Sequence, residues 1–215
     1  MSTGSRARVG EVPGAPGSIR RVKVYTRKGD DGTTGLLFGG RVRKDDPAIE
    51  VNGAVDEAQS ALGVARAETV PGSELDALLV ALERDLWVLM AEVATASGNR
   101  SKLVAGTSLV TPEMVSALEE RIDTLSERFA LPTEFVVPGQ GRVAALLDQA
   151  RTVVRRAERL ATTSPPAADS LVGPYLNRLS DLVWTMARWQ EEEHLPARRA
   201  LEEDGETTTR SRNHG

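Results

Sequence analysis

The feature that most constrains the fold is a series of long segments in which apolar residues recur every three or four positions. The first begins at Asp46 or Pro47 and runs to about Glu68, and one of its faces carries Val51, Ala54, Val55, Ala58, Leu62 and Ala65. This period is that of a helix with one buried face. Asp46 can cap the first free N–H groups, and proline fits the first helical position. The pattern therefore predicts a helix from Pro47 to about Glu68.

Four more segments predict helices. The second follows Ser73 as its N-cap and carries Leu75, Leu78, Leu79, Leu82, Leu86, Leu89 and Val93. The third opens on Thr111-Pro112-Glu113 and ends near Phe129, the fourth covers about Arg142–Thr163, and the fifth runs from about Ala168 to His194. Pro174 is expected to delay or kink the start of the fifth. The fold class is thus all-α: a five-helix bundle, with a four-helix up-and-down core plus one helix, preceded by an extended Gly-rich segment.

The domain organisation is expected to be simple. The 215 residues suffice for one hydrophobic core. Residues 1–20 are rich in Gly, Pro and Ser and predict a disordered extension, 21–194 predict the bundle domain, and 195–215 predict a flexible tail. No apolar run reaches the roughly 20 residues that span a bilayer. The N-terminus lacks the apolar stretch of a secretory signal. A net charge of -4 argues against a general nucleic-acid binder. We predict a cytoplasmic protein.

Cysteine and histidine content excludes several kinds of chemistry. The chain has no cysteine, which removes disulfide scaffolds, thiol catalysis and cysteine zinc sites. Its two histidines, His194 and His214, lie near the end of the chain. A histidine-rich metal centre is therefore impossible, and a di-iron bundle would lack its Glu-x-x-His pairs.

The Gly-rich segment Thr26–Asp46 (TRKGDDGTTGLLFGGRVRKDD) is the first candidate binding element. Five glycines stand among hydroxyl and basic side chains, including those of Thr33, Thr34, Lys28 and Lys44. Glycines let backbone N–H groups approach an anion, and hydroxyls and cations add donors. Phosphate binding is one interpretation, and a flexible loop with ordinary surface charge is the other. The segment is not a Walker A loop, because the terminal G-K-[ST] is missing.

The fourth predicted helix carries the second candidate, ARTVVRRAERLATT. At about 100° per residue, Arg151, Arg155 and Glu158 fall within about 60° of one another. They border an apolar arc made of Leu146, Leu147, Ala150, Val154, Ala157 and Ala161. The planar fork of arginine suits a phosphate. Arg156 and Arg159 point further round, as an ion-pair face would, and an ordinary surface role is also open for the first two arginines.

Polar stripes on two other helices form the third candidate. On the fifth helix Asn177, Asp181, Trp184 and Arg188 share one face, and on the first helix a narrow stripe consists of Asn52, Asp56, Gln59 and Gly63. Such stripes can orient a nucleotide or can form a hydrogen-bond network at the bundle edge. Asp56 could balance one of the arginines.

Five motifs in one order carry a family resemblance: 24–35 (VYTRKGDDGTTG), 53–57 (GAVDE), 135–139 (FVVPG), 150–159 (ARTVVRRAER) and 177–181 (NRLSD). Together they resemble the ATP:cob(I)alamin adenosyltransferases of the propanediol-utilisation type. The resemblance spans about residues 21–190. Each motif alone is weak, whereas five with compatible spacing are specific.

The resemblance implies an assembly and a set of site residues. It implies a homotrimer with an active site at each subunit interface, where the Gly-rich segment wraps ATP and Mg²⁺ assists with the triphosphate. The phosphate-loop pattern is matched by Thr26, Lys28, Gly29, Asp30, Gly32 and Thr34, with Arg27 and Lys44 as neighbouring cations. Nucleotide-site positions are matched by Arg151, Arg155 and Asn177, and Glu158 lies in the same motif as the arginines.

Two further matches complete the expected catalytic set of Arg151, Arg155, Asp56 and Phe135. Asp56 matches an acidic residue that pairs with the first arginine across the interface, and Phe135 matches an aromatic that displaces the lower ligand of the corrinoid. One departure concerns the loop, in which Arg27 and Asp31 replace two lysines of the usual pattern. Asp31 lowers the positive charge expected to face the triphosphate.

The function implied is transfer of the 5′-deoxyadenosyl group of ATP to cob(I)alamin, forming adenosylcobalamin and releasing triphosphate. The corrinoid is itself the nucleophile, so the protein needs to supply position and charge rather than a nucleophile. A flavin reductase and an adenosylcobalamin-dependent mutase are the candidate partners. The alternative is a non-catalytic module that binds ATP or corrinoid for delivery or sensing.

Overall fold

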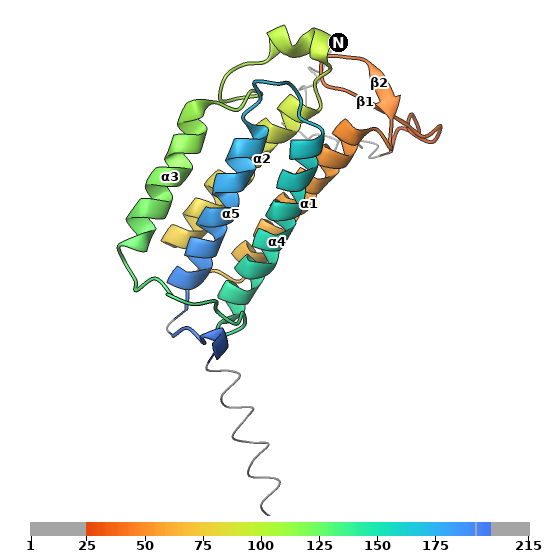
Figure 1. Cartoon of the computed structure of the whole chain (residues 1–215). Helices are drawn as coiled ribbons and strands as arrows, with labels where there is room; N and C mark the ends of the chain where they lie inside the picture. Colours follow the sequence, from red (N-terminus) through yellow and green to blue (C-terminus); the bar gives the residue numbers. More distant parts are fainter. Residues whose placement is uncertain (1–24, 192, 199–215) are drawn as a thin grey trace, which may run out of the picture.

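Five long helices dominate the computed structural model, which describes residues 25–191 and 193–198 (Figure 1). They are α1 (Pro47–Ala67), α2 (Glu74–Val93), α3 (Pro112–Ser126), α4 (Arg142–Thr163) and α5 (Val172–Trp189). A short 3-10 helix, η1 (Ser97–Lys102), follows α2. Strands β1 (Thr33–Gly35) and β2 (Arg41–Arg43) form an antiparallel hairpin in which Thr34 pairs with Val42. None of the helices in this part of the chain is long and apolar enough to cross a membrane.

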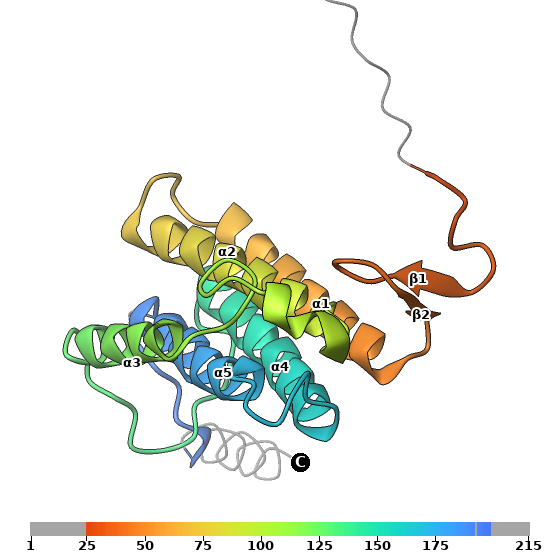
Figure 2. The same ribbon diagram turned by 90° about the horizontal axis from the view of Figure 1, so that it is seen from above.

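The helices pack as a four-helix bundle with α3 on its outside. Helix α1 packs against both α2 and α4, α4 packs against α5, and α3 packs against α5. The view along the bundle shows α3 beside α5 and away from α1 (Figure 2). The Tyr175 hydroxyl donates to Asp85 Oδ2 at 2.8 Å and joins α5 to α2. The predicted five-helix architecture is confirmed.

The sequence signals at the helix starts act as predicted. Asp46 accepts from the Ala48 N–H, Ser73 accepts from the Asp76 N–H, and Thr111 accepts from the Met114 N–H. All six apolar residues of the predicted α1 face are buried. The buried stripe of α1 follows the 3.6-residue period, and this stripe is what packs the helix against α2 and α4.

The predicted C-terminal ends of α3 and α5 were wrong, whereas the delay that Pro174 was expected to cause at the start of α5 is seen. Helix α3 stops at Ser126, before Phe129. Helix α5 begins at Val172 instead of Ala168, because Pro174 is tolerated only in the first turn, where its missing N–H has no helical partner to lose. It ends at Trp189, five residues before His194. The chain then turns so that the Glu191 carboxylate reaches Arg188.

The hairpin and η1 are additions to the predicted elements. Both lie at the bundle end where α1 begins (Figure 1). The Leu37 N–H donates to the Ala94 carbonyl at 2.8 Å, so the hairpin is attached to the end of α2. Residues 1–24 and 199–215, which include all of the predicted extension and most of the predicted tail, lie outside the described residues.

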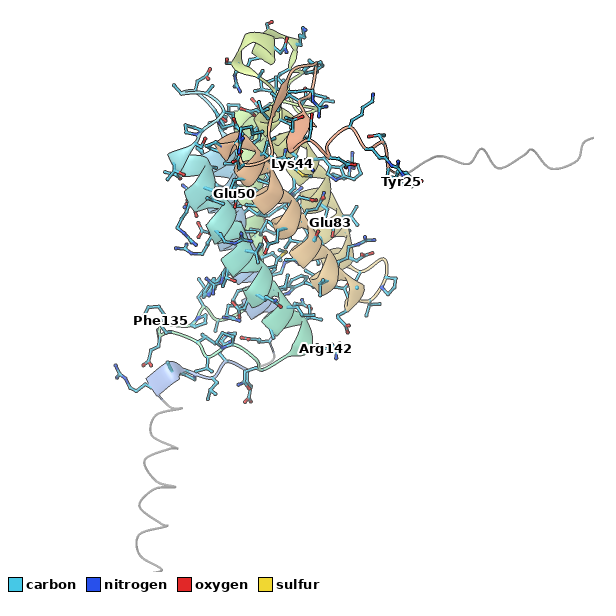
Figure 3. The ribbon with its side chains drawn as sticks, turned by 90° about the vertical axis from the view of Figure 1, so that its right-hand side faces the viewer. Tyr25, Lys44, Glu50, Glu83, Phe135 and Arg142 are labelled. Atoms are coloured by element: carbon cyan, nitrogen blue, oxygen red, sulfur yellow. The ribbon has the colours of Figure 1, made fainter. Side chains whose placement is uncertain are left out.

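The two ends of the bundle carry different parts of the predicted site. Lys44, after the hairpin, lies at one end, whereas Phe135 and Arg142 lie at the other (Figure 3). An ion pair between Arg142 and Glu68, with N–O distance 3.0 Å, joins the start of α4 to the end of α1. The 21 residues of α1 span about 30 Å. Within one chain, the Gly-rich segment and Phe135 are therefore separated by the length of the bundle.

Candidate active site

The Gly-rich segment is an ordered turn closed by its own side chains. Asp31 Oδ1 accepts from the Thr33 N–H at 2.9 Å and from the Thr33 hydroxyl at 2.7 Å. The Thr33 side chain lowers the pKa of the Asp31 carboxyl, followed by the Thr33 backbone N–H, with Arg41 adding attraction. Arg41 Nε donates to the Thr33 hydroxyl at 2.9 Å. Asp31, which departs from the usual family pattern, therefore serves the turn itself.

Two glycines of this segment have a specific steric task. Gly32 has φ of 80°, a backbone conformation that side chains other than glycine rarely adopt. A Cβ atom at Gly29 would stand 3.1 Å from the Thr33 carbonyl oxygen and 3.3 Å from Lys44 Nζ. The Lys44 ammonium thus lies directly over the backbone of Gly29. A close pairing of backbone and cation of this kind suits a phosphate oxygen.

The remaining predicted loop residues are on the surface. The exposed side chains are those of Thr26, Arg27, Lys28 and Asp30, whereas Thr34 is half-buried in β1. Arg27 has φ of 61°, and its guanidinium carbon lies 5.6 Å from the ring centroid of Tyr25. The cations are therefore accessible to an anionic ligand.

At the other end of the bundle, Phe135 and Arg151 line one hollow of about 510 Å³. Its wall also includes Trp184 and Arg188 of α5, Asp148 of α4, and Glu134 with other residues of the loop before α4. The Phe135 ring is 90% exposed. An aromatic ring left in water costs free energy unless a ligand or another chain covers it. The hollow thus combines an apolar ring with a cation.

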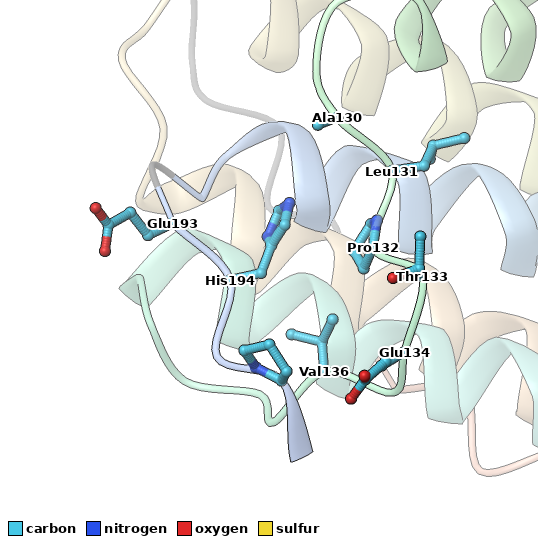
Figure 4. Close-up of a pocket in the computed structure, with 9 residues that line it drawn as sticks. Ala130, Leu131, Pro132, Thr133, Glu134, Val136, Glu193 and His194 are labelled. Atoms are coloured by element: carbon cyan, nitrogen blue, oxygen red, sulfur yellow. The ribbon is translucent and has the colours of Figure 1, made fainter. Parts of the chain in front are cut away.

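The segment that carries Phe135 is fixed by the chain after α5. The Ala197 N–H donates to the Phe135 carbonyl at 2.8 Å, and the Val137 N–H donates to the Leu195 carbonyl at 2.9 Å. His194 lines a second hollow together with Pro132 and Val136 (Figure 4). The first residues of the predicted tail, 195–197, are therefore paired with the loop between α3 and α4.

A polar contact between α4 and α5 joins two other predicted residues. The Asn177 Nδ2 donates to Glu158 Oε1 at 2.7 Å. Arg155 lies one turn before Glu158 on α4 and is exposed. Arg156 forms an ion pair with Glu57 of α1, which agrees with the predicted ion-pair face. Arg151, Arg155 and Glu158 thus follow one edge of α4 from the Phe135 hollow toward the hairpin end.

Asp56 is exposed on α1, and no hydrogen bond or ion pair joins it to Arg151 within the residues that the structure describes. Arg151 instead contacts Asp148, whose Oδ1 lies 3.3 Å from Arg151 Nε. Sequence reasoning missed Asp148 and Glu191 and treated Arg188 only as part of a polar stripe. Asp148 stands three residues before Arg151 on one helix, a spacing that permits contact. That spacing was the available signal.

The family model "Cobalamin adenosyltransferase" matches residues 24–190. A corrinoid adenosyltransferase of Citrobacter freundii is 39% identical over 171 residues, which cover 79% of this chain and 95% of that protein. One from Mycobacterium leprae is 36% identical over 176 residues, covering 80% and 92%.

A solved structure agrees with these relatives. It is that of a phenylalanine-to-alanine variant of a PduO-type ATP:corrinoid adenosyltransferase from Lactobacillus reuteri, complexed with cobalamin and ATP, and it is similar with a TM-score of 0.73 and 26% identity. The similarity covers 82% of this chain and 99% of that one. The chain belongs to the cobalamin adenosyltransferase family, whose members are enzymes that transfer an adenosyl group to a corrinoid.

Proposed function

We propose that this enzyme transfers the 5′-deoxyadenosyl group of ATP to cob(I)alamin and releases triphosphate. The observation that carries the proposal is the hollow in which the exposed Phe135 ring and Arg151 lie together. A corrinoid offers a large apolar ring face, and ATP offers a polyanion. The Phe135 ring suits the corrinoid, and the Arg151 guanidinium suits the phosphates of ATP.

The residues act on position and charge. Cobalt attacks C5′ of the ribose, the bond from C5′ to the phosphate oxygen breaks, and its electron pair leaves with triphosphate. Arg151 and Arg155 stabilise the charge that develops on the leaving group, since preorganised cations act most strongly there. Asn177, whose amide is held by Glu158, orients the nucleotide. Phe135 occupies the lower face of the corrinoid and keeps the nitrogen ligand away from cobalt.

The Gly-rich segment and Lys44 bind phosphate oxygens in this proposal. The described residues contain no group of three His, Asp or Glu side chains placed to hold a metal ion. Mg²⁺ normally keeps several waters and binds through substrate phosphates. We therefore assign Mg²⁺ to the triphosphate as part of the substrate, with few direct protein ligands.

The separation of the hairpin and the Phe135 hollow in one chain supports a homotrimer with sites shared between chains. The hairpin and the Phe135 hollow lie at opposite ends of one bundle, about 30 Å apart by the length of α1. A neighbouring chain in a closed ring can place its hairpin and its exposed Asp56 near the Arg151 of the first chain. Losing one partner of such a partly buried pair would be costly.

The alternative of a non-catalytic delivery or sensing module is separated by one assay. Purified protein is mixed with MgATP and chemically reduced cobalamin, and adenosylcobalamin and triphosphate are measured. Formation of both in equal amounts is the expected result. Binding of ATP and cobalamin without product would support the alternative. A cytoplasmic location and hand-over between a flavin reductase and a mutase stay predictions.

A further inference from the structure

A largely buried cluster of charged side chains, called the charged cluster below, connects Arg188, Glu191 and Asp148 to Arg151. Arg188, in the last turn of α5, donates from Nη2 to Asp148 Oδ2 at 2.5 Å. The same nitrogen donates to Glu191 Oε1 at 2.9 Å. The other oxygen of Asp148 faces Arg151 Nε at 3.3 Å. Asp148 therefore divides its two oxygens between two guanidinium groups, one buried and one at the hollow.

The inner members of the charged cluster have almost no access to water. The exposed fractions of the side chains are 2% for Arg188, 5% for Asp148 and 0% for Glu191. The Arg151 side chain is 28% exposed. The charged cluster thus passes from the interior to the wall of the Phe135 hollow. Arg151, its last group, is more exposed than the Asp148, Arg188 and Glu191 side chains.

Glu191, at the other end of the charged cluster, is also held in place. Glu191 Oε2 lies 2.9 Å from His194 Nδ1. The guanidinium carbon of Arg188 lies 5.8 Å from the ring centroid of Trp184, within the range of a cation–π contact. Each inner side chain therefore has contacts on two sides, which leaves few rotamers open to it.

Stability alone is a weak explanation for this cluster. Two charge pairs buried between helices gain little over apolar side chains of similar size, because desolvation offsets their attraction. Arg188 Nε is moreover buried and has no hydrogen-bond partner among the residues that the structure describes. Such a group carries a free-energy cost that a packed methionine would not have. A buried arginine with an unmatched donor indicates a task other than holding α4 to α5.

We propose that Arg188 is a positioning residue that, through Asp148, holds the Arg151 guanidinium in the orientation used at the Phe135 hollow. The proposal rests on the proposed function, in which Arg151 stabilises the leaving triphosphate. Without Arg188, the Asp148 carboxylate would lose the partner that fixes its orientation, and the long Arg151 side chain would sample several rotamers. Arg188 lines the hollow but its side chain is only 2% exposed, and in this proposal it acts through Asp148 rather than on the substrate.

A double-mutant cycle tests the proposal. Arg188→Met is made in the natural sequence and in an Arg151→Ala background, and adenosylation is measured in the four proteins. If Arg188 acts through Arg151, Arg188→Met lowers the rate by about tenfold with Arg151 present and by less than about twofold without it. Equal losses in both backgrounds would overturn the proposal, because they would show a general structural effect.

Conservative variants guard against misfolding. Arg188→Lys keeps the charge and should recover about half of the logarithmic loss caused by Arg188→Met. Asp148→Asn keeps the shape of the link and should show the same dependence on Arg151 as Arg188→Met. Arg142→Met is the matched control, because it removes an arginine of α4 whose exposed ion pair with Glu68 is not part of the charged cluster. The adenosylation rate of this variant should equal that of the natural protein.

The same cycle, measured as dissociation constants for MgATP, separates this proposal from the proposed function. If no adenosylcobalamin forms but the effect of Arg188 on ATP affinity still requires Arg151, the positioning role stands and the transferase assignment fails. If adenosylcobalamin forms and the effect of Arg188 is independent of Arg151 in both measurements, the positioning role fails alone.

Discussion

The amide of Asn177 on α5 donates a 2.7 Å hydrogen bond to the carboxylate of Glu158 on α4. This contact fixes which atoms of Asn177 remain for a ligand. With Nδ2 turned toward Glu158, Oδ1 accepts from Arg178 Nη1 at 2.6 Å. The side chain therefore has one orientation, and its second amide hydrogen is the group available to a nucleotide.

We predict that Asn177→Asp lowers ATP affinity by about tenfold, because it sets two carboxylates against each other at this distance. Adding Glu158→Gln should recover part of the affinity, since the glutamine amide can donate to the new aspartate. Calorimetric titration with MgATP measures both. A double variant no better than Asn177→Asp would argue against the contact.

Loss of either site arginine should reduce catalysis without unfolding the bundle. Arg151→Ala and Arg155→Ala each remove a charge-assisted hydrogen bond worth roughly 1.5–3 kcal/mol, so we expect a tenfold to hundredfold lower rate. Circular dichroism should show the natural helical content. Arg159→Ala, four residues after Arg155 and exposed on α4, is the control. Natural turnover in the Arg151 or Arg155 variant would remove that residue from the site.

The close contact of Gly29 with Lys44 can be tested by adding a single methyl group. Gly29→Ala would press on the Thr33 carbonyl and displace the Lys44 ammonium. We expect MgATP binding to weaken by about 0.5–1.5 kcal/mol, the net contribution of one hydrogen bond. Gly35→Ala meets no atom within 4 Å and is the matched control. Equal affinities in the two variants would show that the approach of Lys44 is irrelevant to binding.

Much of the fold could be predicted because it depends on local signals. Asp46, Ser73 and Thr111 cap the helices that they were expected to cap, and the α1 face from Val51 to Ala65 is buried as its period requires. The C-terminal end of α5 could not be predicted in this way, although Pro174 did signal the delay at its start. Its C-terminus depends on Glu191 turning back to a buried arginine, which is a tertiary contact.

The types of residue in the site could be predicted from the sequence, but the hydrogen bonds between them could not. The motif around Arg151 identified the arginine, but its partner Asp148 follows from the side-chain geometry of α4 and α5 together. Nor could the pattern show that Asp31 closes a turn with Thr33. The contact between Asp148 and Arg188, in contrast, joins residues far apart in the sequence, and such a contact leaves no periodic trace.

Tyr175 should give the bundle a specific dependence on high pH. Burial, followed by the charge of Asp85, raises the pKa of the Tyr175 hydroxyl well above its usual value. The unfolded chain therefore loses this proton first, and the stabilisation is complete below the usual tyrosine pKa and declines as the pH rises above it. Tyr175→Phe should lower the free energy of unfolding at pH 7 by about 0.5–1.5 kcal/mol.

The difference between the natural protein and Tyr175→Phe should then shrink above about pH 10. Urea unfolding at a series of pH values measures it. Tyr25→Phe, which changes a tyrosine that is 64% exposed, serves as control and should leave stability unchanged. A constant difference across this pH range would contradict the coupling to Asp85.

The central claim is that adenosyl transfer takes place at a site made by two chains, and charge reversal tests it most directly. Asp56→Arg and Arg151→Asp are made separately, and each protein alone should be inactive. The two are then mixed, and subunit exchange is verified by mass spectrometry of the oligomers. In a mixed trimer, some interfaces join the intact Asp56 of one chain to the intact Arg151 of the next. Adenosylcobalamin formation should reappear in the mixture, whereas continued inactivity despite verified exchange, or an active monomer in sedimentation, would contradict the shared site.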